Sequence, residues 1–221
     1  MYFLNNKIKF VIFDLDNTLY DENIYISEVL FTFSQKYHLE FDKNTFLKNT
    51  SLREQTNDMF TFWLKGINFY SEEHQEELFK LYQNISLELK LYKDAKVLLD
   101  FLLSQGIKIG ILTNGTVKAQ QNKISSLKEL KKYNIDVFYA RSLGKEFEKP
   151  HEKAFEAILS LMKVDDKKNV LYIGDNLYTD IGGAKKSGLT GVLIDRYSRY
   201  DQKNQIIFKN LIDLKNNFVD K

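Results

Sequence analysis

The feature that most constrains this chain is an apolar run, Ile8 to Phe13, that ends in two acids, Asp14 and Asp16. Such a run is typical of a central strand in a parallel sheet, because both faces of that strand are buried. An apolar strand has no structural use for two carboxylates at its carboxyl end. Ligands bind at that end of open α/β sheets, so we expect a binding site there.

The two acids also indicate a cofactor. Asp14 and Asp16 lie one residue apart, so their negative charges repel unless a cation lies close to them. A hard divalent ion resolves this repulsion, and Mg²⁺ is the best fit because it takes one or two carboxylates together with water and substrate phosphate. We therefore expect Mg²⁺ at this site.

Composition excludes several classes of function. The 221 residues carry 32 basic and 30 acidic side chains, a net charge of +2 that favours neither a nucleic acid polymer nor a membrane surface. The absence of cysteine excludes disulfides, thiolate metal sites and cysteine nucleophiles. No run approaches about 18 apolar residues, and the short polar start does not resemble a signal peptide. We expect a cytoplasmic protein.

Two hydrophobic patterns divide the chain. Over about residues 22–89 apolar side chains recur every three or four positions, which predicts helices. From Tyr92 onward short apolar strands alternate with helices, which predicts parallel βαβ units with right-handed crossovers. We expect an α/β core made of residues 1–20 and 91–221, with an all-helical domain inserted at residues 21–90. The aromatic residues of the insertion are expected mostly to form its own core.

Polar groups follow two later strands of the expected core. Thr113 and Asn114 come after one apolar strand, where a hydroxyl, an amide and backbone N–H groups at a helix start form an anion cradle. An ordinary strand-to-helix turn is the alternative reading. Asp175 ends another strand, and Asp180 follows five residues later, where it could simply cap a helix.

A lysine completes the set. Lys149 precedes the only proline of the chain, which fixes the backbone near the start of a helix. A lysine whose backbone is held in this way could place its positive charge against a phosphate or a carboxylate. Its neighbours Lys145, Glu146 and Glu148 are expected to be solvated surface groups.

Together these groups supply the parts of phosphoryl transfer. Carboxylates would hold Mg²⁺ and attack phosphorus, donors would bind phosphate oxygens, and a lysine would stabilise the developing charge. One of Asp14 and Asp16 would form an aspartyl-phosphate, and the other would protonate the leaving oxygen and then activate water. The pattern alone does not say which acid has which role.

These motifs resemble a known family. Asp14-x-Asp16-x-Thr18, Thr113-Asn114, Lys149-Pro150 and Gly174-Asp175 with Asp180 match, in order, the four signatures of haloacid dehalogenase-like hydrolases over essentially the whole chain. The first motif looks like that of the phosphatase branch, and the helical block lies where the type-1 cap of that family is found. True dehalogenases of the family lack an aspartate at the position of Asp16, so dehalogenation is not expected.

The resemblance implies a Rossmann-like parallel core with helices on both faces, Mg²⁺-dependent phosphatase chemistry and a role for each residue. Asp14 would be the nucleophile, and Asp16 the general acid and base. The carboxylates of Asp14 and Asp175 and the backbone carbonyl of Asp16 would bind the metal. Thr113, Asn114 and Lys149 would bind the phosphoryl group, Lys149 also stabilising its charge. Thr18 would support these residues without contacting the substrate, and Asp180 would either do the same or be an alternative acidic contact.

Three alternatives remain beside a phosphatase. A phosphomutase needs the same residues. A phospho-accepting receiver also uses acids, a threonine and a lysine around Mg²⁺, but it has no place for acids after the lysine or for a helical insertion. A non-catalytic binding protein would be expected to lose one of the site residues, such as Asp14 or Lys149. We expect hydrolysis of a small phosphorylated metabolite, by a monomer or a weak homodimer.

The insertion would set substrate specificity. Asp21, Glu22, Tyr25, Trp63 and Lys65 are of the kind that could reach a leaving group. Because an aromatic-rich cap suits a nucleobase by stacking, a nucleoside monophosphate is the first expectation and a sugar phosphate the second.

Overall fold

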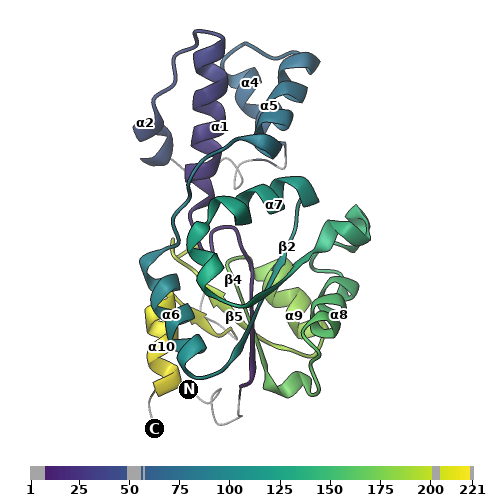
Figure 1. The fold of residues 1–221 in the computed structure, drawn as a ribbon. Coiled ribbons are helices and arrows are strands. Elements are labelled where there is room, and N and C mark those ends of the chain that lie inside the picture. Colours follow the sequence, from purple (N-terminus) through teal and green to yellow (C-terminus); the bar gives the residue numbers. More distant parts are fainter. Residues whose placement is uncertain (1–7, 49–55, 57, 201–204, 220–221) are drawn as a thin grey trace.

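The computed structural model describes residues 8–48, 56, 58–200 and 205–219 (Figure 1). The strands form one parallel sheet in the order β3-β2-β1-β4-β5-β6. Their bounds are β1 Phe10–Phe13, β2 Lys108–Thr113, β3 Ile135–Tyr139, β4 Val170–Gly174, β5 Thr190–Ile194 and β6 Ile207–Phe208. The first strand of the sequence is thus central, as its apolar run predicted.

Helices cover both faces of this sheet. Val11 and Phe13 of β1 pack into one hydrophobic cluster, and Phe10 and Ile12 pack into the other. The first cluster takes residues from α6 (Lys93–Ser104), α7 (Val117–Ser126) and α10 (Leu211–Val219). The second takes residues from α8 (Glu152–Leu161) and α9 (Gly183–Lys186). The expected Rossmann-like α/β core is confirmed.

A group of helices lies beyond the carboxyl ends of the strands (Figure 1). We call α1 (Glu22–Lys36), α2 (Lys43–Lys48), α4 (Met59–Gly66) and α5 (Glu72–Asn84) the helical insertion, because they occur between β1 and the core helix α6. Aromatic side chains form its core: the ring centroid of Phe33 lies 6.1 Å from that of Trp63 and 6.3 Å from that of Phe69. The expected helical pattern around Leu52 lies outside the described residues.

Local details differ from the sequence predictions. The apolar pattern in the sequence predicts a short strand over Val137 to Ala140, whereas the strand occupies Ile135–Tyr139. The two-residue strand β6 was not expected, because so short a segment carries no periodicity. The helix expected after Asp180 begins earlier, as a π-helical turn over Leu177–Gly182. Among the described residues, no helix is both long and apolar enough to cross a bilayer.

Candidate active site

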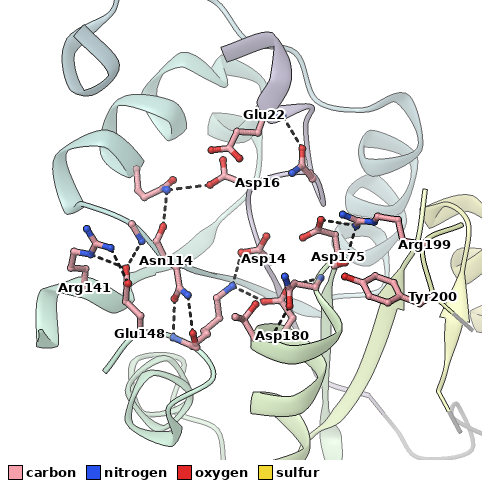
Figure 2. Close-up of a pocket in the computed structure, with 16 residues that line it drawn as sticks. Asp14, Asp16, Glu22, Asn114, Arg141, Glu148, Asp175, Asp180, Arg199 and Tyr200 are labelled. Carbon is pink, nitrogen blue, oxygen red and sulfur yellow. Dashed lines mark hydrogen bonds and ion pairs between the residues drawn. The ribbon is translucent and has the colours of Figure 1, made fainter. Parts of the chain in front are cut away.

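The ends of three strands open into one cleft of about 700 Å³ at the carboxyl edge of the sheet (Figure 2). Asp14 and Asp16 reach it from the end of β1, Asn114 from the end of β2, and Asp175 from the end of β4. Lys149, from the turn before α8, also lines the cleft. Residues far apart in the sequence therefore meet because parallel strands end at the same edge.

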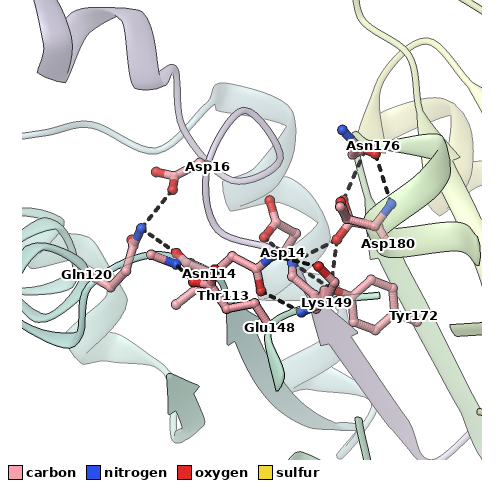
Figure 3. A network of polar contacts seen from close by, with 12 residues as sticks. Asp14, Asp16, Thr113, Asn114, Gln120, Glu148, Lys149, Tyr172, Asn176 and Asp180 are labelled. Atoms are coloured by element: carbon pink, nitrogen blue, oxygen red, sulfur yellow. Dashed lines mark hydrogen bonds and ion pairs between the residues drawn. The ribbon is translucent and has the colours of Figure 1, made fainter. Parts of the chain in front are cut away.

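Lys149 lies at the centre of this site. Its buried ammonium donates to Asp14 Oδ1 at 2.5 Å and to Asp180 Oδ1 at 2.7 Å (Figure 3). It also donates to the Tyr172 hydroxyl at 3.0 Å, which in turn donates to Asp180. Two carboxylates thus offset the cost of removing one lysine charge from water. A charged side chain is stable in a protein interior only when it is paired in this way.

Burial and charge shift the pKa values of this cluster. Burial raises the pKa of Asp14 well above its usual value, and the neighbouring acids Asp180 and Asp175 add to this, while Lys149 opposes it. Burial by itself lowers the pKa of Lys149, but the carboxylates of Asp14 and Asp180 outweigh it and raise that pKa well above normal. Lys149 therefore carries a positive charge beside Asp14.

A divalent cation would fit beside Asp14. Asp14, Asp175 and Asp180 each offer a carboxylate oxygen, and these oxygens lie within 4.8 Å of one another. Burial and, to a lesser extent, the charge of Asp180 raise the pKa of Asp175 to about 7, and a cation at this place would favour the ionised carboxylate. All the donors are oxygens, which suits Mg²⁺. The carboxylate of Asp16 lies outside this group.

Asp180 does not cap the helix that follows it. The side chain of Asn176 takes that place, because its Oδ1 accepts from the backbone N–H groups of Tyr178 and Thr179. Asp180 is instead 1% exposed and bonded to Lys149. Its other oxygen accepts from the Asn176 N–H at 3.0 Å, so Asp180 contacts the start of this helix but is not its N-cap residue.

The side chains of Asp14 and Asp16 point apart, and each has its own lysine (Figure 3). Asp16 Oδ1 accepts from the Tyr20 hydroxyl at 2.5 Å and from Lys123 Nζ at 2.8 Å. Its other oxygen accepts from the Gln120 side-chain amide at 3.1 Å. Burial and the nearby charge of Asp16 raise the pKa of Tyr20 well above its usual value, so Tyr20 stays a donor.

The side chain of Asn114 is committed to the backbone of Lys149. Its Nδ2 donates to the Lys149 carbonyl at 3.0 Å, and its Oδ1 accepts from the Lys149 N–H at 2.9 Å. Thr113 is buried directly before it, at the end of β2. Thr18 is also fully buried, but its hydroxyl has no hydrogen-bond partner among the described residues and it does not line the cleft.

An arginine and a glutamate on the cleft wall were not expected. Glu148 accepts from Arg141 Nε and Nη2, both at 2.9 Å, and from the Gly115 N–H at 2.5 Å. The prediction that Glu148 is a solvated surface group is wrong. The sequence carried no signal for this contact, because Arg141 and Gly115 meet Glu148 only after β2 and the turn before α8 are in place.

Of the insertion residues considered for specificity, only Glu22 lines the cleft. Trp63 packs in the insertion core with its ring centroid 6.0 Å from that of Phe41, and the Lys65 ammonium lies over the ring of Tyr70. Asp21 caps α1 by accepting from the Asn23 N–H. Tyr25 is buried, with its hydroxyl donating to the Tyr82 carbonyl.

The family of this chain follows from comparison with known proteins. The model of the haloacid dehalogenase-like hydrolase family matches residues 8–188. The chain belongs to this family. Its cleft, at the end of β1, contains the acids on which the resemblance rested.

Several relatives of this hydrolase are named phosphatases. A glyceraldehyde 3-phosphate phosphatase of Pyrococcus abyssi is 37% identical over 101 residues, which are 44% of this chain and only 40% of that protein. A ribulose-1,5-bisphosphate 5-phosphatase of Halopiger xanaduensis is 28% identical over 84% of each chain. The pyrophosphatase PpaX of Bacillus mycoides is 28% identical over 85% of this chain and 84% of its own.

Solved structures confirm the fold. The magnesium-bound HAD hydrolase YfnB of Bacillus subtilis superposes with a TM-score of 0.76 at 17% identity, covering 97% of this chain and 100% of that one. A HAD phosphatase of Thermococcus onnurineus gives a TM-score of 0.64 at 23% identity, covering 96% and 98%. At these identities the likeness extends to the fold alone.

Proposed function

We propose that this hydrolase is a Mg²⁺-dependent phosphatase that cleaves a small phosphomonoester through an aspartyl-phosphate intermediate. The observation that carries the proposal is the placement of Asp14 in the cleft, where it is bonded to Lys149 and lies beside two further acids, Asp175 and Asp180. A carboxylate nucleophile, a cation and a fixed ammonium are the parts that phosphoryl transfer requires. The phosphatase names of the relatives support the same chemistry.

Each residue has a distinct task in this mechanism. A carboxylate oxygen of Asp14 forms a bond to phosphorus as the bond to the leaving oxygen breaks. Lys149, held by Asn114 through its backbone, stabilises the charge on the phosphoryl oxygens. Asp16 donates a proton to the leaving oxygen and later takes one from the water that attacks the intermediate. Thr113 is proposed to bind a phosphoryl oxygen.

The metal would be held by Asp14 and Asp175, with the backbone carbonyl of Asp16 as a further ligand. When bound, Mg²⁺ would neutralise charge on the phosphoryl oxygens and orient them. Asp180 contributes by holding Lys149 in place.

The lining of the cleft favours a sugar phosphate over a nucleotide. The residues beside Asp14 are charged or amide-bearing, among them Glu22, Gln120, Arg141 and Glu148. Tyr200 is the one aromatic residue among the described residues that line the cleft, so the stacking that suggested a nucleobase has little support. Two named relatives act on phosphorylated sugars, which agrees with this preference.

We also propose that residues 21–90 form a cap domain over the cleft. The chain leaves and re-enters the core at one point, where the Tyr92 N–H donates to the Leu19 carbonyl at 2.9 Å. Two connections at one point suit a hinge, and closure would exclude water while Asp14 attacks.

The first test is phosphate release from p-nitrophenyl phosphate, with Mg²⁺ or with EDTA, for the wild type and Asp14→Asn. We expect metal-dependent turnover that is lost in the variant, because asparagine cannot form the acyl phosphate. A panel of sugar phosphates, nucleoside monophosphates and pyrophosphate then ranks the substrates. Turnover that is equal in EDTA, or that survives in Asp14→Asn, would refute the proposed chemistry. Much faster hydrolysis of nucleotides would refute the sugar preference.

A further inference from the structure

Lys123 is a buried lysine that the proposed mechanism does not use. Its side chain is 0% exposed, on the face of α7 that also carries the buried Ala119. A buried ammonium is unfavourable unless nearby groups compensate its charge. Lys123 Nζ donates to Asp16 Oδ1 and to Glu22 Oε1, both at 2.8 Å. One lysine of the core thus connects the proposed acid/base to the first residue of the helical insertion.

The surroundings of this lysine come mostly from the insertion. Its ammonium lies 5.3 Å from the ring centroid of Tyr25 on α1 and 5.0 Å from that of Tyr82 on α5. The Tyr82 hydroxyl donates to Glu22 Oε1 at 3.1 Å, the same oxygen that Lys123 contacts. Helices α1 and α5 therefore enclose the lysine only when the insertion is docked as in this structure.

The lysine also fixes the carboxylate of Asp16. Lys123 and Tyr20 both donate to Oδ1, and Gln120 donates to Oδ2, so both oxygens of the Asp16 carboxylate are engaged. Both Gln120 and Lys123 belong to α7. A general acid works only if its proton lies within hydrogen-bond reach of the leaving oxygen, so the groups that orient Asp16 control its efficiency.

We propose that Lys123 is a positioning residue for Asp16, held in place by Glu22, so that the orientation of the acid/base depends on the docked helical insertion. This inference rests on the proposed phosphatase function. It adds a residue that the sequence motifs do not include, and it gives the helical insertion a part in proton transfer besides the exclusion of water.

The decisive experiment compares kcat/KM for substrates whose leaving groups differ in basicity. This parameter reports the steps from free enzyme and substrate up to departure of the leaving group. A poor leaving group needs the proton of Asp16 more than a good one does. We expect Lys123→Met to lower kcat/KM for phenyl phosphate at least about tenfold more than for p-nitrophenyl phosphate. Asp16→Asn should show the same dependence, and Asp16→Asn combined with Lys123→Met should add little further loss.

Matched variants separate positioning from folding. Lys118→Met removes an exposed lysine of the same helix and should leave both substrates unaffected. Lys123→Arg keeps the charge and should retain more activity toward phenyl phosphate than Lys123→Met does. Glu22→Gln removes the negative charge that faces Lys123 and so weakens the link to α1 while Lys123 stays beside Asp16. It should give an intermediate loss with the same dependence on leaving group. Thermal unfolding curves show which variants are folded.

Several results would overturn the inference. Equal losses for both substrates in folded Lys123→Met would show a merely structural lysine, as would losses that add fully to those of Asp16→Asn. If Lys123→Met does not fold, equal losses in Glu22→Gln would have the same meaning. A wild-type protein without Mg²⁺-dependent turnover of any phosphate ester would instead refute the proposed function.

Discussion

At the scale of single residues, the site depends on side chains that hold other side chains. Asn114 is an example, because both ends of its amide are bonded to the backbone of Lys149. Lys149 in turn reaches Asp14, Asp180 and Tyr172 through one ammonium group. A change in the backbone at Lys149 would therefore move the charge that the transferring phosphoryl group requires.

Asn114→Ala tests this dependence. Loss of the two hydrogen bonds should displace Lys149, and we expect kcat/KM for p-nitrophenyl phosphate to fall about 10- to 100-fold, since misplacement of a catalytic group by about 1 Å is that costly. Steady-state kinetics provide the measurement. Asn84→Ala, at an exposed position in α5, is the matched control and should behave as wild type. An Asn114→Ala enzyme within twofold of wild type would contradict the idea.

A second residue-scale prediction concerns Arg199. Its guanidinium donates to Asp175 Oδ2 at 3.1 Å, which places a positive charge beside the proposed metal site. That charge should oppose binding of Mg²⁺, so Arg199→Met is expected to lower the Mg²⁺ concentration for half-maximal activity about three- to tenfold. The measurement is a Mg²⁺ titration at pH 8.5, above the pKa of about 7 that the Asp175 carboxyl has beside Arg199. An unchanged or weaker requirement for Mg²⁺ would count against it.

At the scale of elements, one aspartate joins three segments of the core. Asp94, in the first turn of α6, accepts from Arg196 at 2.8 and 3.2 Å and from the Leu211 N–H at the start of α10. Arg196 also donates to the Thr18 carbonyl at 3.1 Å, so the loop after β1 is tied to the same group. In the sequence alone, the apolar pattern that follows Asp94 predicts only that a helix starts there.

Asp94→Ala should destabilise the protein more than loss of a surface acid does. It leaves the Arg196 charge and the Leu211 N–H without this buried partner, so we expect the free energy of unfolding to fall by about 2–4 kcal/mol. Urea denaturation measures the change. Asp165→Ala removes an exposed partner of Lys9 and should cost less than about 1 kcal/mol. Equal effects of the two substitutions would show that the Asp94 contacts contribute little.

At the scale of the whole molecule, the proposed cap and the core are linked in two ways. The connecting segments meet at the Leu19–Tyr92 hydrogen bond, and Lys123 joins α7 of the core to Glu22 of α1. The first contact would allow rotation of the insertion, whereas the second would hold its docked position. The solved structure of YfnB, of similar fold, is described as showing interdomain movement in that protein.

We expect this chain to become more compact when Mg²⁺ and beryllium fluoride occupy the site, since beryllium fluoride mimics the phosphoryl group on Asp14. Small-angle X-ray scattering with and without the two ligands measures the change in radius of gyration. Asp14→Asn, which cannot hold the mimic, should show no change. Identical scattering of the wild-type protein in both states would argue against closure of the insertion.

The sequence by itself determined the architecture and the set of proposed reacting groups. Apolar strands that end in Asp14, Thr113 and Asp175 are local patterns, and parallel strands bring such ends to one edge of a sheet. The alternation of strands and helices likewise predicted the core, and the three- to four-residue periodicity predicted the helical block between β1 and β2. These predictions needed only short-range information.

The tertiary structure decided which side chains contact these groups. Lys123 is 107 residues from Asp16, and its only local signal is a lysine at helical spacing from the buried Ala119 and Leu127. Glu148 is bonded to Arg141, although the sequence predicted a solvated side chain. Trp63 packs in the insertion core and does not line the cleft. Hydrophobic periodicity identifies the buried face of a helix. The partner of a polar side chain depends instead on how separate elements pack together, which no single stretch of sequence determines.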